Sequence, residues 1–599
     1  MTASRPQQIT NRIAQHAAPF WHCGVAIVIA AVLAVPHPLS AALQQGASDG
    51  EWRVYGGDSG HTRYASLDQI DTSNVEDLEV VWRWTARNFG PNPNIRSSTT
   101  PLMVDGVLYA TAGMRRAVVA IDAGTGETLW TWSMIEGERL SSAPRPNPGR
   151  GVGYWEDEEG NARILVVTPG YHMAALDARS GVPIADFGRD GIVDLMEGHR
   201  ARDGVNIVGT IGSSSPPTIA GDVVVVGSAH HVGFQPPTRA NTPGDIRGFD
   251  VRTGKLIWTF KTIPEPGELG VDTWQDDSWS YTGNAASWAP ISFDPETGWV
   301  YVPTEAATGD YYGGHRPGNN VFSTSVLVLD SQTGERVWHF QTVHHDIWDL
   351  DNPTAPILAD IEIEGEPRKI VIQITKQGFA FVLDRLTGEP VWPIEERAVA
   401  TDSNIPGEVP SPTQPFPTKP APFEYQGVVE DDLVDFTPEI RQMAIEAVQD
   451  FRLGPLYTPM MIADENIRGL LFRPTGGGAA SWTGAAHDPE TGILYVPSIN
   501  RSGVMSFYSP QDGTLRYTHG APETQRLASG ADQNTPRMPM GLPLLKPPYS
   551  RMTAIDMNTG EHVWMTPMGN GDRIRNHPLL KDLDLPPLGG DGRGGPLLT

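Results

Sequence analysis

One short phrase recurs along the chain and constrains its fold more than any other feature. It reads Asp-x-x-Thr-Gly-x-x-x-Trp and ends at Trp130, Trp258, Trp338, Trp392 and Trp564, with a degraded copy from Asp177 to Gly181. Each copy predicts a hairpin in which an apolar strand ends at Asp, Thr-Gly makes the turn, and a second strand carries the Trp. Because the Trp recurs at a fixed offset, we expect it to pack between neighbouring repeats.

A second repeat supports the same architecture. Residues 285–304 (AASWAPISFDPETGWVYVPT) align without a gap with residues 479–498 (AASWTGAAHDPETGILYVPS). The 64 Gly and 53 Pro residues fit many turns between short strands. The sequence therefore predicts an all-β fold, a β-propeller whose radial repetition shields strand edges. Coincidental hairpins in an unrelated sandwich are the alternative.

Two insertions interrupt the repeats. Thr437, Pro438 and Glu439 supply an N-cap, a first-turn Pro and an acid, which predicts a short helix over residues 438–451. Residues 405–425 are rich in proline, which predicts an extended, semi-rigid crossing over the ring surface.

Residues 1–42 have the order of a secretory signal. Arg5 and Arg12 precede an apolar run over 24–35, followed by Pro36 and small residues. This run is short for a membrane span, which needs about 20 residues, and an uncleaved anchor is the alternative. The only cysteine, Cys23, lies in this segment, so the mature domain, residues 48–599, is expected to have no disulfide. We expect that domain in the periplasm, free or associated with the inner membrane.

The charge of the chain excludes one class of partner. Its formal net charge is −27, and no run of Lys and Arg interrupts the acidic balance. A nucleic acid would find no basic surface, so DNA and RNA are not expected as partners.

The densest cluster of chemically active residue types is TVHHDIWDLDNP, residues 342–353. Such a loop could hold a general base, a metal or a sugar. The alternative is a polar turn whose Asp and His side chains cap backbone groups. Farther along, Lys376 ends an apolar strand, where a solvated strand end is the ordinary interpretation.

Other candidates are less specific. Arg150 lies between glycines, which allow close approach of an anion, but Gly-Arg-Gly is also a common exposed turn. Trp288 and Trp482 hold equivalent places in the second repeat, so at least one is expected in the core. His230 and His231 suggest a metal, yet no third ligand stands at a telling spacing.

Together these segments resemble a known family, the pyrroloquinoline-quinone (PQQ)-dependent dehydrogenases, and within it the quinoprotein glucose dehydrogenase branch. The resemblance runs from about Gly50 to the C-terminus. It is carried by GDSGHTRYASLDQI, RGVGYW, SSPPTIAGDVVVVGS, IRGFDVRTGKLIW, the AASW segments, GGHRPGNN, VWHFQTVHHDIWDLDNPTAPILAD and ITKQGF. The QTVHHDIWD string followed by the Lys is the most specific element.

The resemblance implies an eight-bladed ring with the quinone near its axis, and a last blade left incomplete because GGPLLT matches only its opening strand. It implies Asp349 as catalytic base and Lys376 as the catalytic cation at the quinone oxygens. The other cofactor-binding residues it implies are Arg150, at a quinone carboxylate, Trp288, beneath the ring, and Thr308, His231 and Trp482. Asp349, Thr308 and His231 are the expected ligands of a divalent cation, Ca²⁺ or Mg²⁺.

Two departures from the alcohol-oxidising branch concern this site. Where that branch binds calcium through Glu and Asn, this chain has Val232 and Ala306, with His231 and Glu305 as neighbours. Where that branch has adjacent cysteines beside the quinone, this chain has the proline-rich APRPNPG, residues 143–149.

The expected function is oxidation of a sugar or polyol hydroxyl, with glucose as the first candidate, by hydride transfer to the quinone. No Cys-x-x-Cys-His haem motif exists, so electrons would pass to ubiquinone or a cytochrome c and on to the respiratory chain. The alternatives are an alcohol or polyol dehydrogenase and a non-catalytic periplasmic propeller scaffold. A scaffold has no need of the HHDIWD loop.

Overall fold

The Thr-Gly phrases form tight hairpin turns in the computed structural model. It describes residues 45–89, 97–231, 238–464, 466–508, 518–519, 536–590, 592 and 594–599. In the turn before Trp338, Asp330 Oδ1 accepts hydrogen bonds from Thr333 N at 2.9 Å and Thr333 Oγ1 at 3.1 Å. Gly334 closes the turn at φ +72°, a conformation that favours glycine.

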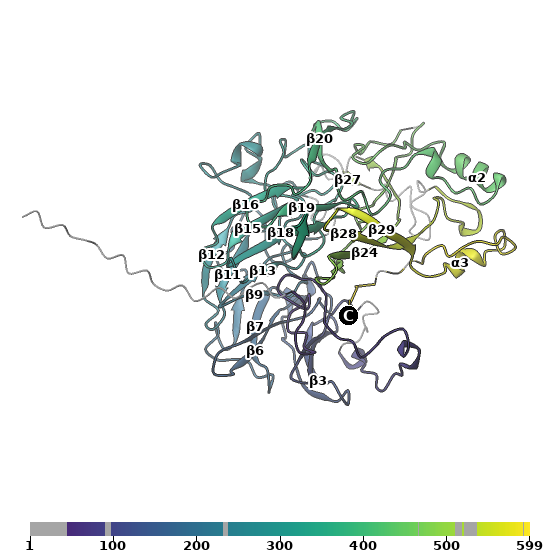
Figure 1. The fold of residues 1–599 in the computed structure, drawn as a ribbon. Helices are drawn as coiled ribbons and strands as arrows, with labels where there is room; N and C mark the ends of the chain where they lie inside the picture. The colour runs from purple at the N-terminus through teal and green to yellow at the C-terminus, as the bar shows by residue number, and fades with distance from the viewer. Residues whose placement is uncertain are drawn as a thin grey trace, which may run out of the picture. The chain divides into compact units, whose positions relative to one another are not determined.

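The described residues contain six antiparallel sheets of three or four strands, which follow one another in chain order (Figure 1). The first three are β1–β4 (Leu102–Val104, Val107–Ala112, Ala117–Asp122, Thr128–Trp132), β5–β8 (Gly153–Glu156, Ala162–Val167, His172–Asp177, Ile192–Asp194) and β9–β12 (Thr218–Ala220, Val223–Val226, Ile246–Asp250, Leu256–Phe260). The next are β13–β16 (Ser292–Asp294, Trp299–Pro303, Ser325–Asp330, Arg336–Gln341) and β17–β19 (Ile357–Ile363, Glu366–Ile374, Ala380–Asp384). The last joins β23 (Ala486–His487), β24 (Ile493–Ile499), β28 (Ser550–Asp556) and β29 (Glu561–Pro567).

The remaining elements lie in the long insertions. Three strand pairs are β20 (Ile394–Ala398) with β21 (Thr413–Pro417), β22 (Leu470–Phe472) with β25 (Gly503–Met505), and β26 (Phe507–Tyr508) with β27 (Thr518–His519). The α-helices are α1 (Glu138–Ser141), α2 (Pro438–Val448) and α3 (Asp572–Arg575). Short 3₁₀ turns cover Val75–Asp77, Ala86–Asn88, Val271–Thr273, Ser278–Ser280, Glu430–Asp432 and Pro539–Gly541.

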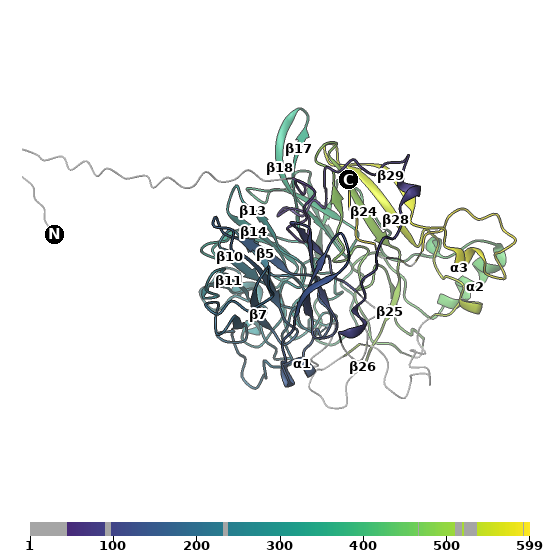
Figure 2. The ribbon, with the colours of Figure 1, turned by 90° about the horizontal axis from the view of Figure 1, so that it is seen from below.

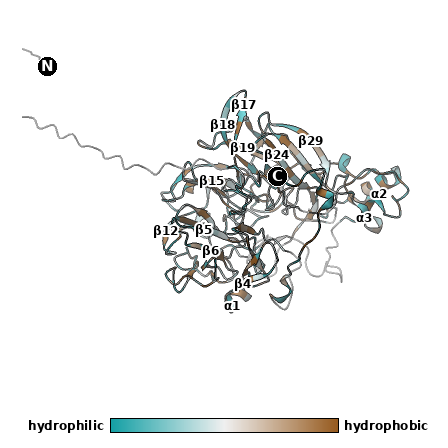
Figure 3. Ribbon diagram, turned by 60° about the horizontal axis from the view of Figure 1, so that its bottom comes forward, coloured by the Kyte–Doolittle hydropathy of each residue, from teal (hydrophilic) through white to brown (hydrophobic). Residues whose placement is uncertain are grey.

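The sheets in the middle of the series bury both of their faces against neighbouring sheets. In β6, Ile164 and Val166 pack toward β1–β4, whereas the alternating Leu165 and Val167 pack toward β9–β12. The same two-sided burial explains why hydrophobic stretches, brown in Figure 3, recur in the strands. The hydrophobic core is thus a series of layers between consecutive sheets.

The repeated tryptophans lock these layers together. Trp258 Nε1 donates to Ser331 O at 2.8 Å, and Trp338 Nε1 donates to Arg385 O at 3.2 Å, each in the next sheet. Both indoles are only 7% exposed. A Cβ added to Gly334 would lie 2.6 Å from the Trp258 indole, so the turn glycine also makes room for the preceding tryptophan. The predicted packing of Trp between repeats is confirmed for Trp258 and Trp338, whereas Trp564 is 43% exposed and lies beside Tyr495 of its own sheet.

The first strands of consecutive sheets line the middle of the arrangement. β5 contacts β9, β9 contacts β13, and β13 contacts β17. An N-terminal segment runs across these inner strands, since Phe293 N donates to Ser59 O at 2.9 Å and Leu358 N donates to Gly60 O at 2.8 Å. Figure 2 gives a second view, in which the β17–β18 hairpin extends beyond its neighbours.

The predicted all-β propeller is confirmed, whereas the count of eight blades stays a prediction, because the described residues form six such sheets. Near the C-terminus, Leu598 forms a parallel bridge with Tyr64. The predicted helix is also confirmed, and Thr437 caps it by accepting from Ile440 N at 3.2 Å. It ends at Val448, so Phe451 lies beyond it, although Phe451 is buried.

Some expectations fall outside the structure. The signal at residues 1–42, Cys23 and Val232 lie outside the described residues. Among the helices that the structure describes, none has the length and apolar character to cross a membrane.

Candidate active site

Asp349 and Lys376, far apart in sequence, meet in a direct ion pair. Lys376 Nζ donates to Asp349 Oδ1 at 2.7 Å and to the Asp349 backbone oxygen at 3.0 Å. Tyr311 Oη donates to the other carboxylate oxygen, Oδ2, at 3.0 Å. Asp349 has φ +57°, in the left-handed region, so its loop holds an uncommon backbone conformation to present this carboxylate.

A second carboxylate joins the pair. Asp351 also forms an ion pair with Lys376, and its other oxygen accepts a hydrogen bond from Trp288 Nε1. Lys376 Nζ lies 5.8 Å from the centroid of the Trp288 ring. One ammonium, two carboxylates and one indole therefore share a single buried site.

In the loop after β16, some polar residues stabilise the turn and others contact Lys376. Asp346 Oδ1 accepts from Trp348 N at 3.0 Å and from Leu350 N at 3.3 Å, which shapes the turn. His345 Nε2 bonds Glu408 Oε1 at 2.9 Å, and both side chains are buried. The expectation of a polar turn thus holds for His345 and Asp346, whereas the later acids of the loop face Lys376.

Arg150 is a second cation beside the Trp288 indole. Its guanidinium donates to Ser214 Oγ at 2.7 Å, Ser215 Oγ at 3.1 Å and Trp288 O at 3.0 Å. Its Cζ lies 5.0 Å from the Trp288 ring and 5.4 Å from the Trp482 ring. Arg150 is buried, its Nε has no hydrogen-bond partner, and no ion pair of this side chain occurs within the described residues.

Both tryptophans of the second repeat belong to this site. Trp288 and Trp482 are each partly exposed, and they flank the same guanidinium. The expectation that at least one of them is a core residue is wrong. The AASW segments precede β13 and β23, and both indoles lie against the Arg150 guanidinium.

Burial and crowding raise the pKa values of the acids. Burial, the dominant cause, together with the nearby Asp351 charge, raises the pKa of Asp349 to about 8, although Lys376 opposes the shift. Burial and Asp351 likewise raise the pKa of Glu305 to about 8. The pKa of Asp310 is raised well above its ordinary value by burial and by Asp349. The site therefore has acids that hold protons near neutral pH.

Glycines allow the backbone of the AASW approach to come close to these groups. A Cβ added to Gly476 would lie 2.3 Å from both Asp349 Oδ2 and Tyr311 Oη. A Cβ added to Gly478 would lie 2.7 Å from Lys376 Cγ. The TGGG run before Ala479 is thus required by the shape of the site.

A buried arginine that the sequence did not indicate, Arg116, supports the chain segments around Arg150. Arg116 donates to the backbone oxygens of Val167 at 2.8 Å, Ser213 at 2.6 Å, Arg145 at 3.0 Å and Asn147 at 3.3 Å. Its acceptors are neutral, and burial lowers the pKa of Arg116 to about 9. Arg116 fixes three chain segments that converge on Arg150.

Thr308 and His231 are the least connected of the predicted site residues. Thr308 is buried, donates its backbone N–H to Gly283 O at 3.1 Å, and its carbonyl bonds a His315 ring nitrogen at 3.0 Å. His231 is half-buried, and burial and the Arg145 charge lower its pKa. Their assignment to the cofactor and the metal stays a prediction.

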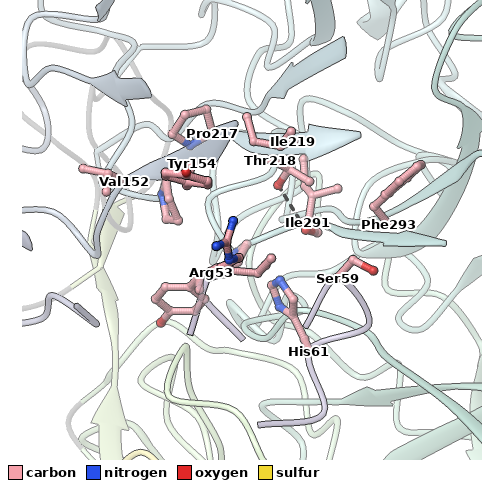
Figure 4. A pocket seen from close by; sticks show the side chains of 15 residues that line it. Arg53, Ser59, His61, Val152, Tyr154, Pro217, Thr218, Ile219, Ile291 and Phe293 are labelled. Atoms are coloured by element: carbon pink, nitrogen blue, oxygen red, sulfur yellow. Dashed lines mark hydrogen bonds between the residues drawn. The ribbon is translucent and has the colours of Figure 1, made fainter. Parts of the chain in front are cut away.

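A small cavity lies elsewhere among the inner strands. It measures about 40 Å³ and is lined by residues that include Arg53, His61, Tyr154, Thr218 and Ile291 (Figure 4). None of Asp349, Lys376, Arg150 and Trp288 lines it. It is a packing space beside the N-terminal segment rather than part of the site.

Comparisons with known proteins agree with this geometry. The family described as "PQQ: Glucose/ethanol/alcohol dehydrogenase, beta-propeller domain" matches residues 52–599. The chain belongs to this family. It is a PQQ-dependent dehydrogenase, an oxidoreductase acting on CH–OH groups, as the sequence predicted.

Two curated relatives of this dehydrogenase are similar along most of its length. The glycerol dehydrogenase large subunit of Gluconobacter oxydans is 31% identical, with 93% of this chain and 76% of the relative covered. The quinate/shikimate dehydrogenase (quinone) of Acinetobacter baylyi is 30% identical, with 92% and 69% covered. A europium-containing methanol dehydrogenase has a similar fold, with a TM-score of 0.59 at 19% identity, covering 86% of this chain and 78% of that one.

The residues of this dehydrogenase fit PQQ. The cofactor is planar and carries three carboxylates, and Arg150 is a buried cation whose Nε has no partner and which forms no ion pair with any described residue. Trp288 offers an aromatic face, and cations lie near it at two points, Arg150 at 5.0 Å and Lys376 at 5.8 Å from the ring centroid.

The site has the oxygen atoms that a divalent cation prefers, but they are not arranged around one point. Asp310, Asp349, Asp351 and Glu305 provide carboxylate oxygens, which Ca²⁺ and Mg²⁺ prefer. In the part of the chain that is described, however, no three His, Cys, Asp or Glu side chains converge so that they could hold a metal. Members of this family bind a divalent cation, and its ligands in this chain stay a prediction.

Sequence reasoning missed three functional neighbours: Tyr311, Asp351 and Arg116. Asp351 lay in the polar loop at residues 342–353, but no pattern distinguished it from the other acids of that loop. No pattern marked Tyr311 or Arg116, whose partners lie in other sheets.

Proposed function

We propose that this dehydrogenase oxidises a hydroxyl group of a sugar or polyol, with Asp349 as the base. The observation that carries the proposal is the buried Asp349–Lys376 pair beside Trp288, at 2.7 Å between Oδ1 and Nζ. The similarity to a glycerol dehydrogenase supports a polyol, and glucose is the first sugar to test.

In this reaction PQQ supplies the two-electron oxidant that accepts the hydride from the substrate carbon. The substrate C–H and O–H bonds break, the hydroxyl proton passes to a carboxylate oxygen of Asp349, and a carbonyl forms. Asp349 can take this proton because Lys376 and Tyr311 fix the orientation of its two oxygens. Its raised pKa makes it a stronger base than an ordinary aspartate.

Lys376 has a second role in this proposal. Its ammonium lies within reach of both Asp349 and Asp351, so it can stabilise negative charge that develops on an oxygen bound above Trp288. Burial makes this stabilisation stronger than it would be in water. Arg150 would hold a carboxylate of the cofactor beside the same indole.

The acceptor and the compartment are part of the proposal. Electrons would leave for ubiquinone or a cytochrome c, since the chain has a single cysteine and hence no haem-attachment motif. The predicted signal at residues 1–42 supports a periplasmic location, free or at the inner membrane.

Reconstitution tests the proposal. The purified protein is incubated with PQQ and Ca²⁺ or Mg²⁺, and reduction of an electron-accepting dye is followed with glucose, glycerol and simple alcohols. We expect turnover with glucose or glycerol that requires PQQ. A protein that binds PQQ but oxidises none of these substrates would contradict the proposal.

A further inference from the structure

The loop over residues 143–149 holds an arginine that the mechanism above does not use. It connects α1 to β5, and Arg116 fixes it by donating to the backbone oxygens of Arg145 and Asn147. Asn147 N also donates to Arg145 O at 2.9 Å. The backbone of Arg145 is therefore held in place, and the prolines of the loop restrict the backbone further.

The side chain of Arg145 lacks a partner in the part of the chain that the structure describes. Its Nε is buried and unpaired, and its guanidinium makes no hydrogen bond or ion pair within the described residues, although the residue is only partly buried. Its charge acts on the acid Glu305, on Arg150 and on His231. Arg145 thus lies within electrostatic range of both sides of the site.

Among the described residues, no acid forms an ion pair with Arg145. Glu305, which the Arg145 charge reaches, keeps its Oε1 buried without a hydrogen-bond partner. Arg150 and the buried Arg116 add two further positive charges to the same region, and Arg145 and Arg150 repel each other. An anion bound between Arg145 and Arg150 would relieve their mutual repulsion.

We propose that Arg145 binds a carboxylate of a ligand in the active site. The inference rests on the proposed function, because it takes the Asp349–Lys376 cluster to be the reaction site. A carboxylate can come from PQQ or from a hydroxy-acid substrate. The planar guanidinium suits either, since it can donate two parallel hydrogen bonds to one carboxylate.

The experiment compares the wild type with Arg145→Gln and Arg145→Lys. Arg179→Gln serves as the matched control, because Arg179 is an exposed arginine in the turn after β7. The first arm measures PQQ binding to the cofactor-free protein by quenching of tryptophan fluorescence. The second arm measures KM for quinate, a hydroxy acid, and for glycerol, which is neutral.

Loss of a charged hydrogen-bonding partner should weaken carboxylate binding about 10- to 100-fold. If PQQ supplies the carboxylate, the dissociation constant for PQQ rises by that factor in Arg145→Gln. If the substrate supplies it, the KM for quinate rises while that for glycerol and the PQQ affinity stay constant. Arg145→Lys should show a smaller loss in the same arm, and it replaces the Gln variant if that protein does not fold.

Variants that match Arg179→Gln in both arms would overturn the inference. A wild type that binds no PQQ would instead contradict the proposed function, so the two failures can be told apart.

Discussion

Replacing the proposed base by its neutral isostere gives the sharpest test of the site. In Asp349→Asn the side chain keeps its shape, and its oxygen can still accept from Lys376, which lies 2.7 Å from Asp349 Oδ1. The variant cannot take up the substrate proton. A positioned general base contributes about 10²- to 10⁴-fold, so kcat should fall by that factor, equivalent to about 2.7–5.5 kcal/mol.

PQQ affinity should be unchanged in this variant, because Arg150 bonds Ser214, Ser215 and Trp288 and not Asp349. Dye-linked turnover with saturating glycerol or glucose and fluorescence titration with PQQ measure the two quantities. Asp203→Asn is the matched control, since Asp203 is exposed. An Asp349→Asn protein that binds PQQ and turns over within tenfold of the wild type would refute the assignment of the base.

The remaining predictions concern pH, charge and the repeats. The pKa of Asp349 is raised to about 8, and the reaction needs the deprotonated carboxylate. Wild-type turnover should therefore rise about tenfold per pH unit from pH 6 to about 8 and level off above it. A turnover profile that is flat from pH 6 to 9 would contradict this prediction. Lys376→Met leaves two buried acids without their cation, so it should lower the free energy of unfolding by about 3–5 kcal/mol at pH 9. It should also shift the midpoint of the pH profile of turnover upward. Equal urea midpoints for variant and wild type would exclude that reasoning. Gly334→Ala places a Cβ 2.6 Å from the Trp258 indole, at a residue with φ +72°. Urea unfolding should show a free energy of unfolding that is lower by about 1–3 kcal/mol from overpacking and by about 1–2 kcal/mol from backbone strain. Gly221→Ala, at φ +63° with no atom within 4 Å, should show the strain alone, so equal losses in the two variants would argue against a packing role for the turn glycine.

The repeats made the architecture predictable because they act locally. An Asp, a Thr and a Gly at fixed offsets determine a turn through hydrogen bonds that span only a few residues, as Asp330 shows. The short helix was predictable for the same reason, since Thr437 caps it from three residues away. The end of that helix at Val448 was not, because Phe451 is buried by tertiary packing whether or not the helix continues.

The site was predictable only in part. Family resemblance singled out Asp349, Lys376, Arg150 and Trp288, which the structure brings together, although their chemical roles stay predictions. Trp482 could not be distinguished from a core residue, because its sequence context repeats that of Trp288 and only the ring arrangement decides where each indole faces.

By itself, the sequence determined where the repeated hairpins form and that the chain carries a net charge of −27. The tertiary structure alone decided which of the chain's cations remain without an acid. In the described residues, Arg150 and Arg145 form no ion pair while two carboxylates share Lys376, because charge pairing depends on distances across different sheets that no local pattern specifies.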